Sequence, residues 1–448
     1  MSADLGGASV LIVGAGLAGL AAAHDLVAMR ADVTVIDARD RIGGRVWTTH
    51  EPFAGSQHAE AGGDMIDEGH HALRRLAGRL GLTLTRILRG GFGYVRANGR
   101  GRPRIAPRGA ARGWGHLAGA LSSLGERYRL VERRWDSPIA TDFGRRSVAS
   151  WLEEVQADHD LRITATSLRG FFLADPDELS LLALVDQFAA DEGAELPRMY
   201  RISGGNDKLV AALAKPLGER LKLKTELLAV SHRGGGVRAS VRGGRQLAQM
   251  RADYLLLAAP ATLVRRIPIT PALPPQQHEA IANLKYGRAT KTLVQFTERF
   301  WRVGRRPLAF GSPLPFGAVW DGNEEQRARP GILSMLAGGS ASDATRARTA
   351  SEGVEGLVRW LDWLGADRAK VVAWRQVGWD ADPWSRGGYA FFDPAFDPGL
   401  RAWLARPFGP IFFAGEHTSQ QWQGYMNGAV ESGQRAAAEI AAVHRLQA

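Results

Sequence analysis

Three glycines near the N-terminus have the spacing that a bound diphosphate requires. Gly14, Gly16 and Gly19 follow an apolar run at residues 10–13, and an Ala- and Leu-rich stretch continues from them to residue 26. In this G-x-G-x-x-G pattern the first glycine permits a tight turn, and the second lets a pyrophosphate approach the backbone. The third lets a helix pack close to the preceding strand. The N-terminus of that helix, with Leu17 and Ala18, would present free N–H groups and partial positive charge to the phosphates.

An acidic residue follows at the distance that a ribose contact needs. Residues 33–36 are typical of a second buried strand, and Asp37 ends it 18 residues after Gly19. An acid at this place accepts hydrogen bonds from a ribose 2′-OH. The pattern therefore predicts a dinucleotide-binding βαβ unit. A βαβ unit kept only for packing is the alternative.

Two more glycine pairs follow this unit. Gly43 and Gly44 lie between Arg39 and Arg45, so backbone N–H groups and a guanidinium could face one phosphate. A turn with a surface arginine explains the same residues. Gly62 and Gly63 suggest a close approach to a flat group, and tight packing is an equal explanation.

Composition limits the classes of protein to consider. The chain has 448 residues, of which 45% are hydrophobic and 23% charged, and this balance is typical of a soluble globular protein with two or more domains. Cysteine is absent, which excludes disulfides, thiol catalysis and thiolate metal ligands. No basic region precedes the first apolar run, and no run is long enough to span a membrane. We expect a cytoplasmic protein and no metal site.

The net charge of +11 favours acidic ligands. No basic run is long enough, or interleaved with aromatic residues, to indicate a nucleic-acid groove. We interpret the charge as an arginine-rich surface.

The remaining elements are predicted from hydrophobic periodicity and turn residues. Asn206 or Asp207 is a candidate cap for one helix. Helices are expected at 70–80, 118–124, 147–155, 179–189 and 208–217, and strands at 221–231, 237–242 and 254–260, the last of which ends at a turn.

Sequence motifs at both ends resemble the flavin-containing amine oxidases, the monoamine and polyamine oxidase family. The resemblance rests on the glycine fingerprint, the block at 39–45, the Gly62-Gly63 turn, and the C-terminal segments 411–416 and 422–429. It implies an α/β fold (α+β overall), with a Rossmann-like FAD-binding domain and an interleaved substrate domain of mixed sheet and helices. The expected FAD-binding domain comprises 1–84, 201–285 and 395–448, and the substrate domain 85–200 and 286–394.

The same resemblance implies FAD as the cofactor. Without cysteine the flavin must be held noncovalently. Asp37 stands where the family usually has Glu. The expected cofactor-binding residues are Gly14, Gly16, Leu17, Ala18, Gly19, Asp37, Ala38, Arg39, Gly43, Gly44, Arg45, Gly62, Gly63, Asp64, Met65, Leu227, Trp379, Gly415, Glu416, Gly424, Tyr425 and Met426.

Three residues match the family's catalytic positions. Lys291 corresponds to a lysine that organises a water beside flavin N5, and Tyr389 and Tyr425 correspond to the two walls of an aromatic cage that orients the amine. The implied reaction oxidises a primary or secondary amine to an imine by hydride transfer to the flavin. O2 then takes the electrons and gives H2O2. A small amine and O2 are the expected partners, and a homodimer is left open.

The substrate class is less well defined. Relatives that oxidise amino acids have an arginine where this chain has Met65, and polyamine oxidases of plants have an acid where it has Asp67. Asp67 would select a second ammonium group, or it merely caps the following helix. An L-amino acid oxidase, a desaturase or dehydrogenase with another electron acceptor, and a flavin-bearing module without turnover are the alternatives. Intact Lys291, Tyr389 and Tyr425 argue against the last of these.

Overall fold

The first apolar run forms the middle strand of a five-stranded parallel sheet. The computed structural model describes residues 4–96, 103–107, 112–190, 198–233, 235–304 and 307–447. Side chains of β1 alternate between two cores, with Val10 and Ile12 in one and Leu11 and Val13 in the other. A strand buried on both faces needs such a continuous apolar run. The sheet has the order β10-β2-β1-β14-β23 and comprises Ser9–Val13 (β1), Asp32–Ile36 (β2), Leu221–Lys222 (β10), Tyr254–Leu257 (β14) and Ile411–Phe413 (β23).

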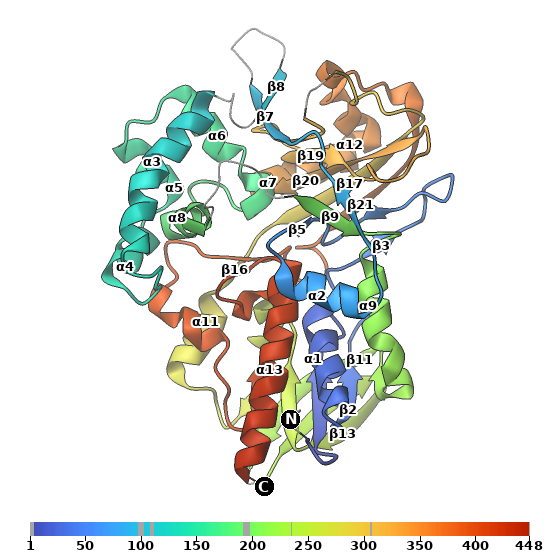
Figure 1. The fold of residues 1–448 in the computed structure, drawn as a ribbon, viewed down its shortest axis with the longest axis vertical. Helices are drawn as coiled ribbons and strands as arrows, with labels where there is room; N and C mark the ends of the chain where they lie inside the picture. Colours follow the sequence, from blue (N-terminus) through green and yellow to red (C-terminus); the bar gives the residue numbers. More distant parts are fainter. Residues whose placement is uncertain are drawn as a thin grey trace.

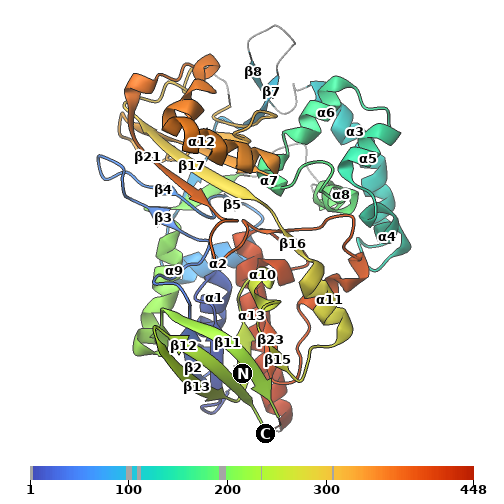
Figure 2. The same ribbon diagram turned by 180° about the vertical axis from the view of Figure 1, so that it is seen from behind.

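Helices cover one face of this sheet (Figure 1), and a second sheet covers the other (Figure 2). The helices α1 and α13 pack so closely that only glycine fits at one contact. A Cβ on Gly433 of α13 would lie 2.2 Å from the carbonyl oxygen of Ala18 in α1. The helical face holds Leu17–Ala28 (α1), His71–Arg79 (α2), Asp207–Ala214 (α9) and Met426–Gln447 (α13). The covering sheet holds Thr225–His232 (β11), Val237–Gly243 (β12), Gln246–Ala252 (β13) and Ile269–Thr270 (β15), with Ala261–Val264 (α10) and Pro275–Asn283 (α11) beside it.

A seven-stranded sheet occupies the other half of the molecule (Figure 1). Strand β17 is buried along its whole length, because β20 and β21 pair with it on either side and both of its faces are covered. The helix Ser340–Arg359 (α12) packs on this sheet through Val354 and Val358. The order β21-β17-β20-β19-β18-β7-β8 comprises Val371–Gly378 (β21), Ala289–Phe296 (β17), Gly331–Gly338 (β20), Ala318–Asp321 (β19), Ala309–Gly311 (β18), Phe92–Arg96 (β7) and Arg104–Pro107 (β8).

A group of helices lies beside this sheet, around its own apolar core (Figure 1). It comprises Arg112–Arg129 (α3), Pro138–Gly144 (α4), Val148–Glu154 (α5), His159–Thr166 (α6), Arg169–Phe172 (α7) and Leu181–Ala190 (α8). Small sheets connect the two halves: Thr48–Thr49 (β3) with Ala59–Glu60 (β4), Ile66–Asp67 (β5) and Leu84–Ile87 (β6) with Met199–Ile202 (β9), and Lys285–Tyr286 (β16) with Ala390–Phe391 (β22). Short 3-10 helices lie at Lys215–Arg220 (η2), Asp362–Leu364 (η3), Arg368–Lys370 (η4), Pro398–Leu404 (η5) and Glu416–Thr418 (η6).

The predicted fold class, a mixture of helices and sheets with a Rossmann-like parallel sheet, is confirmed. One element was predicted wrongly, because the single strand expected at 221–231 is two strands, β10 and β11. Lys224 between them has a φ of 52°, which breaks an extended chain, and the two strands join different sheets. The exact division into an FAD-binding and a substrate domain stays a prediction.

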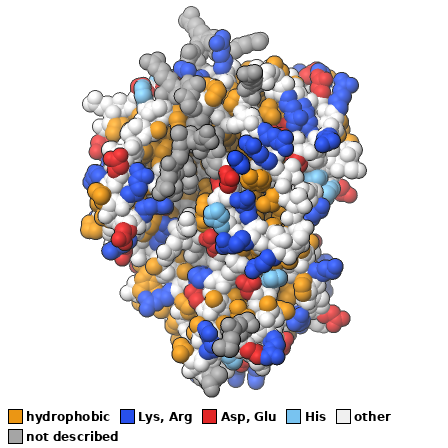
Figure 3. All heavy atoms as spheres, viewed as in Figure 1, with side chains coloured by type: hydrophobic (Ala, Val, Ile, Leu, Met, Phe, Trp, Pro, Cys, Tyr) orange, Lys and Arg blue, Asp and Glu red, His pale blue; other side chains and the backbone are white. Residues whose placement is uncertain are grey.

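Charged side chains of both signs are scattered over the face shown in Figure 3, and Lys and Arg form no continuous band there. Among the described residues we find no helix with the length and hydropathy that crossing a bilayer would require. Within the same residues there is no group of three or more His, Asp or Glu that could hold a metal ion.

Candidate active site

A cavity of about 1320 Å³ begins at the carboxyl ends of β1, β14 and β23, where Gly14, Ala258 and Gly415 line it. This edge of a parallel sheet is where α/β proteins bind their ligands. The cavity continues to Lys291 on β17 and brings together residues from the whole chain. Every expected site residue lines it except Gly19: Gly14, Gly16, Leu17, Ala18, Asp37, Ala38, Arg39, Gly43, Gly44, Arg45, Gly62, Gly63, Asp64, Met65, Asp67, Leu227, Lys291, Trp379, Tyr389, Gly415, Glu416, Gly424, Tyr425 and Met426.

The three glycines of the fingerprint have three different surroundings. Gly14 has a φ of 114°, and a Cβ there would lie 2.8 Å from the carbonyl oxygen of Ala258. A Cβ on Gly19 would lie 2.0 Å from the carbonyl oxygen of Gly14, so this glycine serves helix packing and lies behind the cavity wall. A Cβ on Gly16 would meet nothing within 4 Å. Gly16 is also the N-cap of α1 and has no side chain to cap it, so the first N–H groups of this helix are available to an anion.

Asp37 lies beside this turn. Its carboxylate accepts hydrogen bonds from the backbone N–H groups of Ala15 at 2.7 Å and Arg39 at 2.8 Å. Burial raises the pKa of Asp37 in spite of these bonds, which act in the opposite direction. The Asp37 carboxylate is therefore held rigidly beside the first two glycines of the fingerprint.

Two arginines expected at the cofactor have protein partners. Arg39 forms a two-pronged ion pair with Asp382, with both N–O distances at 2.7 Å. Arg45 donates to Glu416 at 2.9 Å and to the carbonyl oxygen of Gly388 at 2.7 Å. Both arginines thus tie the first βαβ unit to the segment that carries Tyr389.

The Gly62-Gly63 turn is fixed by contacts on several sides. A Cβ on Gly62 would lie 1.9 Å from the carbonyl oxygen of Arg45, and one on Gly63 would lie 2.9 Å from Sδ of Met426. The side-chain amide of Asn206 donates to the carbonyl oxygens of Gly63 at 3.1 Å and Asp64 at 2.8 Å. The turn therefore has no room for side chains and forms a smooth part of the cavity wall.

Lys291 lies buried at the other side of this turn, with only 2% of its surface exposed. Its Nζ donates to Oδ2 of Asp64 at 2.8 Å and to the carbonyl oxygen of Gly62 at 3.1 Å. It also lies 4.9 Å from the ring centre of Trp320. Burial lowers the pKa of Lys291, and the Asp64 carboxylate opposes that shift.

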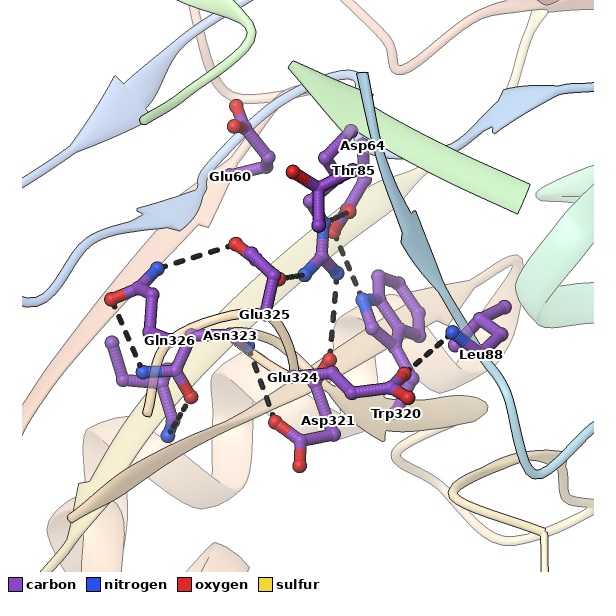
Figure 4. A network of polar contacts seen from close by, with 12 residues as sticks. Glu60, Asp64, Thr85, Leu88, Trp320, Asp321, Asn323, Glu324, Glu325 and Gln326 are labelled. Atoms are coloured by element: carbon purple, nitrogen blue, oxygen red, sulfur yellow. Dashed lines mark hydrogen bonds and ion pairs between the residues drawn. The ribbon is translucent and has the colours of Figure 1, made fainter. Parts of the chain in front are cut away.

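Asp64 is the centre of a buried network (Figure 4). Besides Lys291, it accepts hydrogen bonds from Nε of Arg201 at 2.5 Å and from the indole N–H of Trp320 at 2.9 Å. Arg201 also pairs with Glu325 at 2.9 Å. Burial alone would raise the pKa of Asp64, but Arg201 and then Lys291 outweigh it and hold that pKa below its usual value. Asp64 is thus an ionised partner of Lys291.

Tyr389 and Tyr425, the two tyrosines of the expected aromatic cage, also line the cavity. Tyr389 donates a short hydrogen bond to the carbonyl oxygen of Phe171, and burial, with Tyr425 as the next cause, raises its pKa. Tyr425 is 38% exposed and its hydroxyl lies 3.5 Å from Oε1 of Gln187. A Cβ on Gly424 would lie 3.3 Å from the Tyr389 ring, so glycine is needed between the two aromatic residues.

The geometry agrees with comparisons to known proteins. The family model of flavin-containing amine oxidoreductases matches residues 17–441.

The chain belongs to the flavin-containing amine oxidoreductase family.

Similar proteins match it over nearly its whole length. Amine oxidase [flavin-containing] A of Bos taurus is 24% identical over 462 residues, which cover 96% of this chain and 84% of the relative. Cyclohexylamine oxidase from Brevibacterium oxydans IH-35A has a similar structure, with a TM-score of 0.86, 27% identity, and coverage of 98% of this chain and 99% of that one. Wild-type putrescine oxidase bound to putrescine has a TM-score of 0.82, 25% identity, and coverage of 97% and 99%.

The predicted family is therefore confirmed. As a flavin-containing amine oxidoreductase, the protein is an enzyme that acts on amines, and its family implies a flavin cofactor.

In this amine oxidoreductase the cavity beyond the tyrosines is lined by aromatic side chains. Phe92 contacts Phe171 with ring centres 5.0 Å apart, and Tyr94 stacks on Trp114 at 5.1 Å. All four line the cavity. This end is suited to an apolar group.

Met65 and Asp67 also line the cavity. Oδ1 of Asp67 accepts a hydrogen bond from the N–H of Gly69 at 2.6 Å, so the carboxylate stabilises the turn before α2. Asp67 is not the cap of α2, because the N-cap residue is His70 and this helix start has no side-chain cap bond. A role of Asp67 in amine recognition stays a prediction.

Several residues around the site were not predicted. Arg201 is far in the sequence from the segment that holds Trp320 and Glu325, and both are far from Asp64, so no spacing signals this network. Asn206 was expected as a helix cap, but its side chain makes no cap bond and holds the glycine turn instead. His70 packs edge-on against Tyr425, with ring centres 5.3 Å apart, and burial lowers its pKa to about 4, so it is a neutral support for that tyrosine.

Proposed function

We propose that this protein binds FAD noncovalently and oxidises a primary or secondary amine to an imine, with O2 as the electron acceptor and H2O2 as the second product. Water then hydrolyses the imine to an aldehyde or ketone. The observation that carries the proposal is the buried Lys291 in the wall of a cavity that also holds the dinucleotide fingerprint and both tyrosines.

The residues present fit FAD. Gly16 leaves the N-terminus of α1 open for the pyrophosphate, Asp37 suits a ribose hydroxyl, and the smooth Gly62-Gly63 turn suits a flat ring. The chain has no cysteine for a thioether bond to the flavin. When bound, FAD supplies a two-electron acceptor for the amine and a donor of those electrons to O2.

The tyrosines would bind and orient the amine. Their π-faces attract a cationic nitrogen on arrival, and their rings restrict the position of its α-carbon. The amine must be neutral when its α-hydrogen leaves, because the nitrogen lone pair stabilises the positive charge that develops. Aromatic rings suit this neutral form, because they carry no negative charge that would hold the amine protonated.

Lys291 would act on the oxygen side of the reaction. An ammonium has three N–H donors, and Asp64 and Gly62 take two of them. The third remains for a partner in the cavity, such as an ordered water. A fixed positive charge at this place favours negative charge that develops on oxygen during its reduction.

The lining favours an amine with an apolar substituent. Met65 occupies the place of the carboxylate-binding arginine of amino acid oxidases, so an amino acid substrate would find no guanidinium there. Cyclohexylamine oxidase, a structural neighbour, is named for an amine of the apolar type. Putrescine oxidase, another neighbour, was solved with a diamine, and Asp67 would be the group that recognises a second ammonium here. A cytoplasmic location remains our expectation.

A panel of amines tests the proposal. Purified protein should be yellow, release its flavin on acid precipitation, and form H2O2 with at least one monoamine. Turnover of free amino acids with no turnover of amines would assign the protein as an amino acid oxidase. Amine-dependent reduction without peroxide would indicate another electron acceptor.

A further inference from the structure

Arg201 is the largest charged side chain in the interior next to the candidate site, and the proposed reaction does not use it directly. It lies on β9 and is 2% exposed. Its guanidinium has two ionic arms, Nε to Asp64 and Nη1 to Glu325, and a weaker contact from Nη2 to the carbonyl oxygen of Asp321 at 3.4 Å. A buried arginine with this many fitted contacts is held in one orientation.

The first arm leads to Lys291. Asp64 receives Arg201 on Oδ1, and Lys291 with Trp320 on Oδ2. Figure 4 shows Asp64 meeting Trp320 and Glu325, which come from β19 and the turn that follows it. The two oxygens of one carboxylate thus connect the arginine to the lysine. A rotation of Asp64 that broke one contact would break the other.

We propose that Arg201 is a positioning residue that acts through Asp64 to keep the Lys291 ammonium charged and aimed at the cavity. This inference rests on the proposed function, in which Lys291 serves the reaction with oxygen.

The burial of Lys291 explains why its ammonium needs a charged partner. Taking a lone ammonium out of water favours its neutral form. The titratable and charged groups that face Lys291 are Asp64 and Glu60 from the segment around β4 and Arg201 from β9. Asp64 is the only one of them that contacts its Nζ within 4 Å among the described residues. The positive charge of Arg201 by itself lowers the pKa of Lys291. Its favourable effect on the lysine therefore runs through Asp64: Arg201 favours the ionised state of Asp64, and this ionised carboxylate in turn favours the charged lysine.

The first test is a pH titration of the visible absorption of the bound flavin, which needs no turnover. Lys291→Met identifies the spectral change that belongs to the lysine, since this variant lacks it. Asp64→Asn keeps the shape of the side chain and removes the anion. We expect it to move the Lys291 transition down by more than about one pH unit, because a buried ammonium would then face Arg201 without a counter-ion. An unmoved transition would overturn the proposal.

The second test separates the two arms of Arg201. Arg201→Met should slow reoxidation by O2 about tenfold or more, and should leave anaerobic reduction by an amine within about threefold. Glu325→Gln is the matched control, because it weakens the other arm. It should lower the melting temperature and leave both rates within about twofold. Equal effects of Arg201→Met and Glu325→Gln on the rates would make Arg201 a structural bridge and contradict the proposal.

A double variant completes the design. If Arg201 acts only through Asp64, then Asp64→Asn combined with Arg201→Met reoxidises no more slowly than Asp64→Asn alone. Additive losses would contradict this path. Should Arg201→Met fail to fold, Arg201→Gln replaces it in both comparisons, with the same results expected. A normal oxygen reaction in Lys291→Met would instead disprove the role of Lys291 in the proposed function, and the two failures are therefore distinct.

Discussion

Nζ of Lys291 lies 2.8 Å from Oδ2 of Asp64, although 227 positions separate them in the chain. The lysine comes from β17 of the seven-stranded sheet, and the aspartate follows the Gly62-Gly63 turn. Their contact closes the cavity wall between the two halves. It also makes the charge of Lys291 depend on the Asp64 carboxylate.

Replacing this lysine tests its part in the oxygen reaction. Lys291→Met should slow reoxidation by O2 far more than anaerobic reduction by an amine, by about tenfold or more, because the fixed positive charge is lost. Stopped-flow absorbance measures both half-reactions. The control is Lys285→Met, which changes an exposed lysine on β16, the strand that precedes β17 in the chain. It should alter neither half-reaction. Equal losses in both half-reactions would assign Lys291 a general structural role.

The cage should depend on ring shape more than on the phenol proton. We expect the ring, and not the phenol group, to orient the amine, so Tyr425→Phe should keep most of the reduction rate. The contact of the Tyr425 hydroxyl with Oε1 of Gln187 is long, at 3.5 Å. Tyr425→Ala removes the ring and should lose about tenfold to a hundredfold, on the order of 1–3 kcal/mol of positioning. Loss of activity in Tyr425→Phe as large as in Tyr425→Ala would show that the hydroxyl, and not the ring, is what the reaction needs.

Asp67 connects the turn before α2 to the choice of substrate. Asp67→Asn keeps an oxygen for the N–H of Gly69, so the turn should persist and monoamine turnover should change by less than about twofold. A matched diamine should lose about tenfold in kcat/KM, because the carboxylate that would attract its distal ammonium is neutralised. The two substrates are compared on the same preparation. If both lose equally, Asp67 serves only the turn before α2 and has no part in diamine recognition.

The buried Glu60 makes the free energy of unfolding depend on pH in a definite direction. Burial, and then the nearby Asp64, raise the pKa of Glu60 to about 8, so the folded protein keeps a proton that the unfolded chain releases near pH 4.5. The stability that this proton confers is present below pH 4.5 and is lost as pH rises towards 8, with a slope of up to about 1.4 kcal/mol per pH unit.

Glu60→Gln should therefore flatten the fall in stability between pH 5.5 and 8, because glutamine needs no proton to be buried. Denaturant unfolding at the two pH values measures the difference. Glu126→Gln on the exposed side of α3 is the control and should keep the slope of the parent protein. An unchanged slope in Glu60→Gln would mean that Glu60 is already ionised in the folded state.

The strands and the helix of the first βαβ unit were predictable because their signals are local. The glycine spacing, the apolar strand and Asp37 are all within one βαβ unit, and each has a steric or hydrogen-bonding cause that is visible in the sequence. The identity of Lys291 and the tyrosines came from resemblance, since a lysine in a strand carries no signal of its own.

What the sequence did not predict depends on long-range contacts. Arg201 is an ordinary strand arginine until β9 brings it to Asp64. Asn206 is a typical helix cap by position, but its Oδ1, the atom that would cap the helix, accepts from the backbone N–H of Ile202 instead. Its amide NH2 donates to the carbonyl oxygens of the glycine turn. The chain breaks at Lys224 because the segments on either side of it, β10 and β11, pair in different sheets. None of these outcomes follows from local propensity.

The most direct test of the central claim follows one sample through both halves of the reaction. The protein is mixed with an amine substrate without oxygen, and the flavin absorbance is recorded before and after O2 is admitted. We predict that the amine bleaches the flavin, that O2 restores the absorbance, and that one H2O2 appears for each flavin reoxidised. A flavin that no amine in a broad panel bleaches, or that O2 reoxidises without forming peroxide, would contradict an amine oxidase that uses O2.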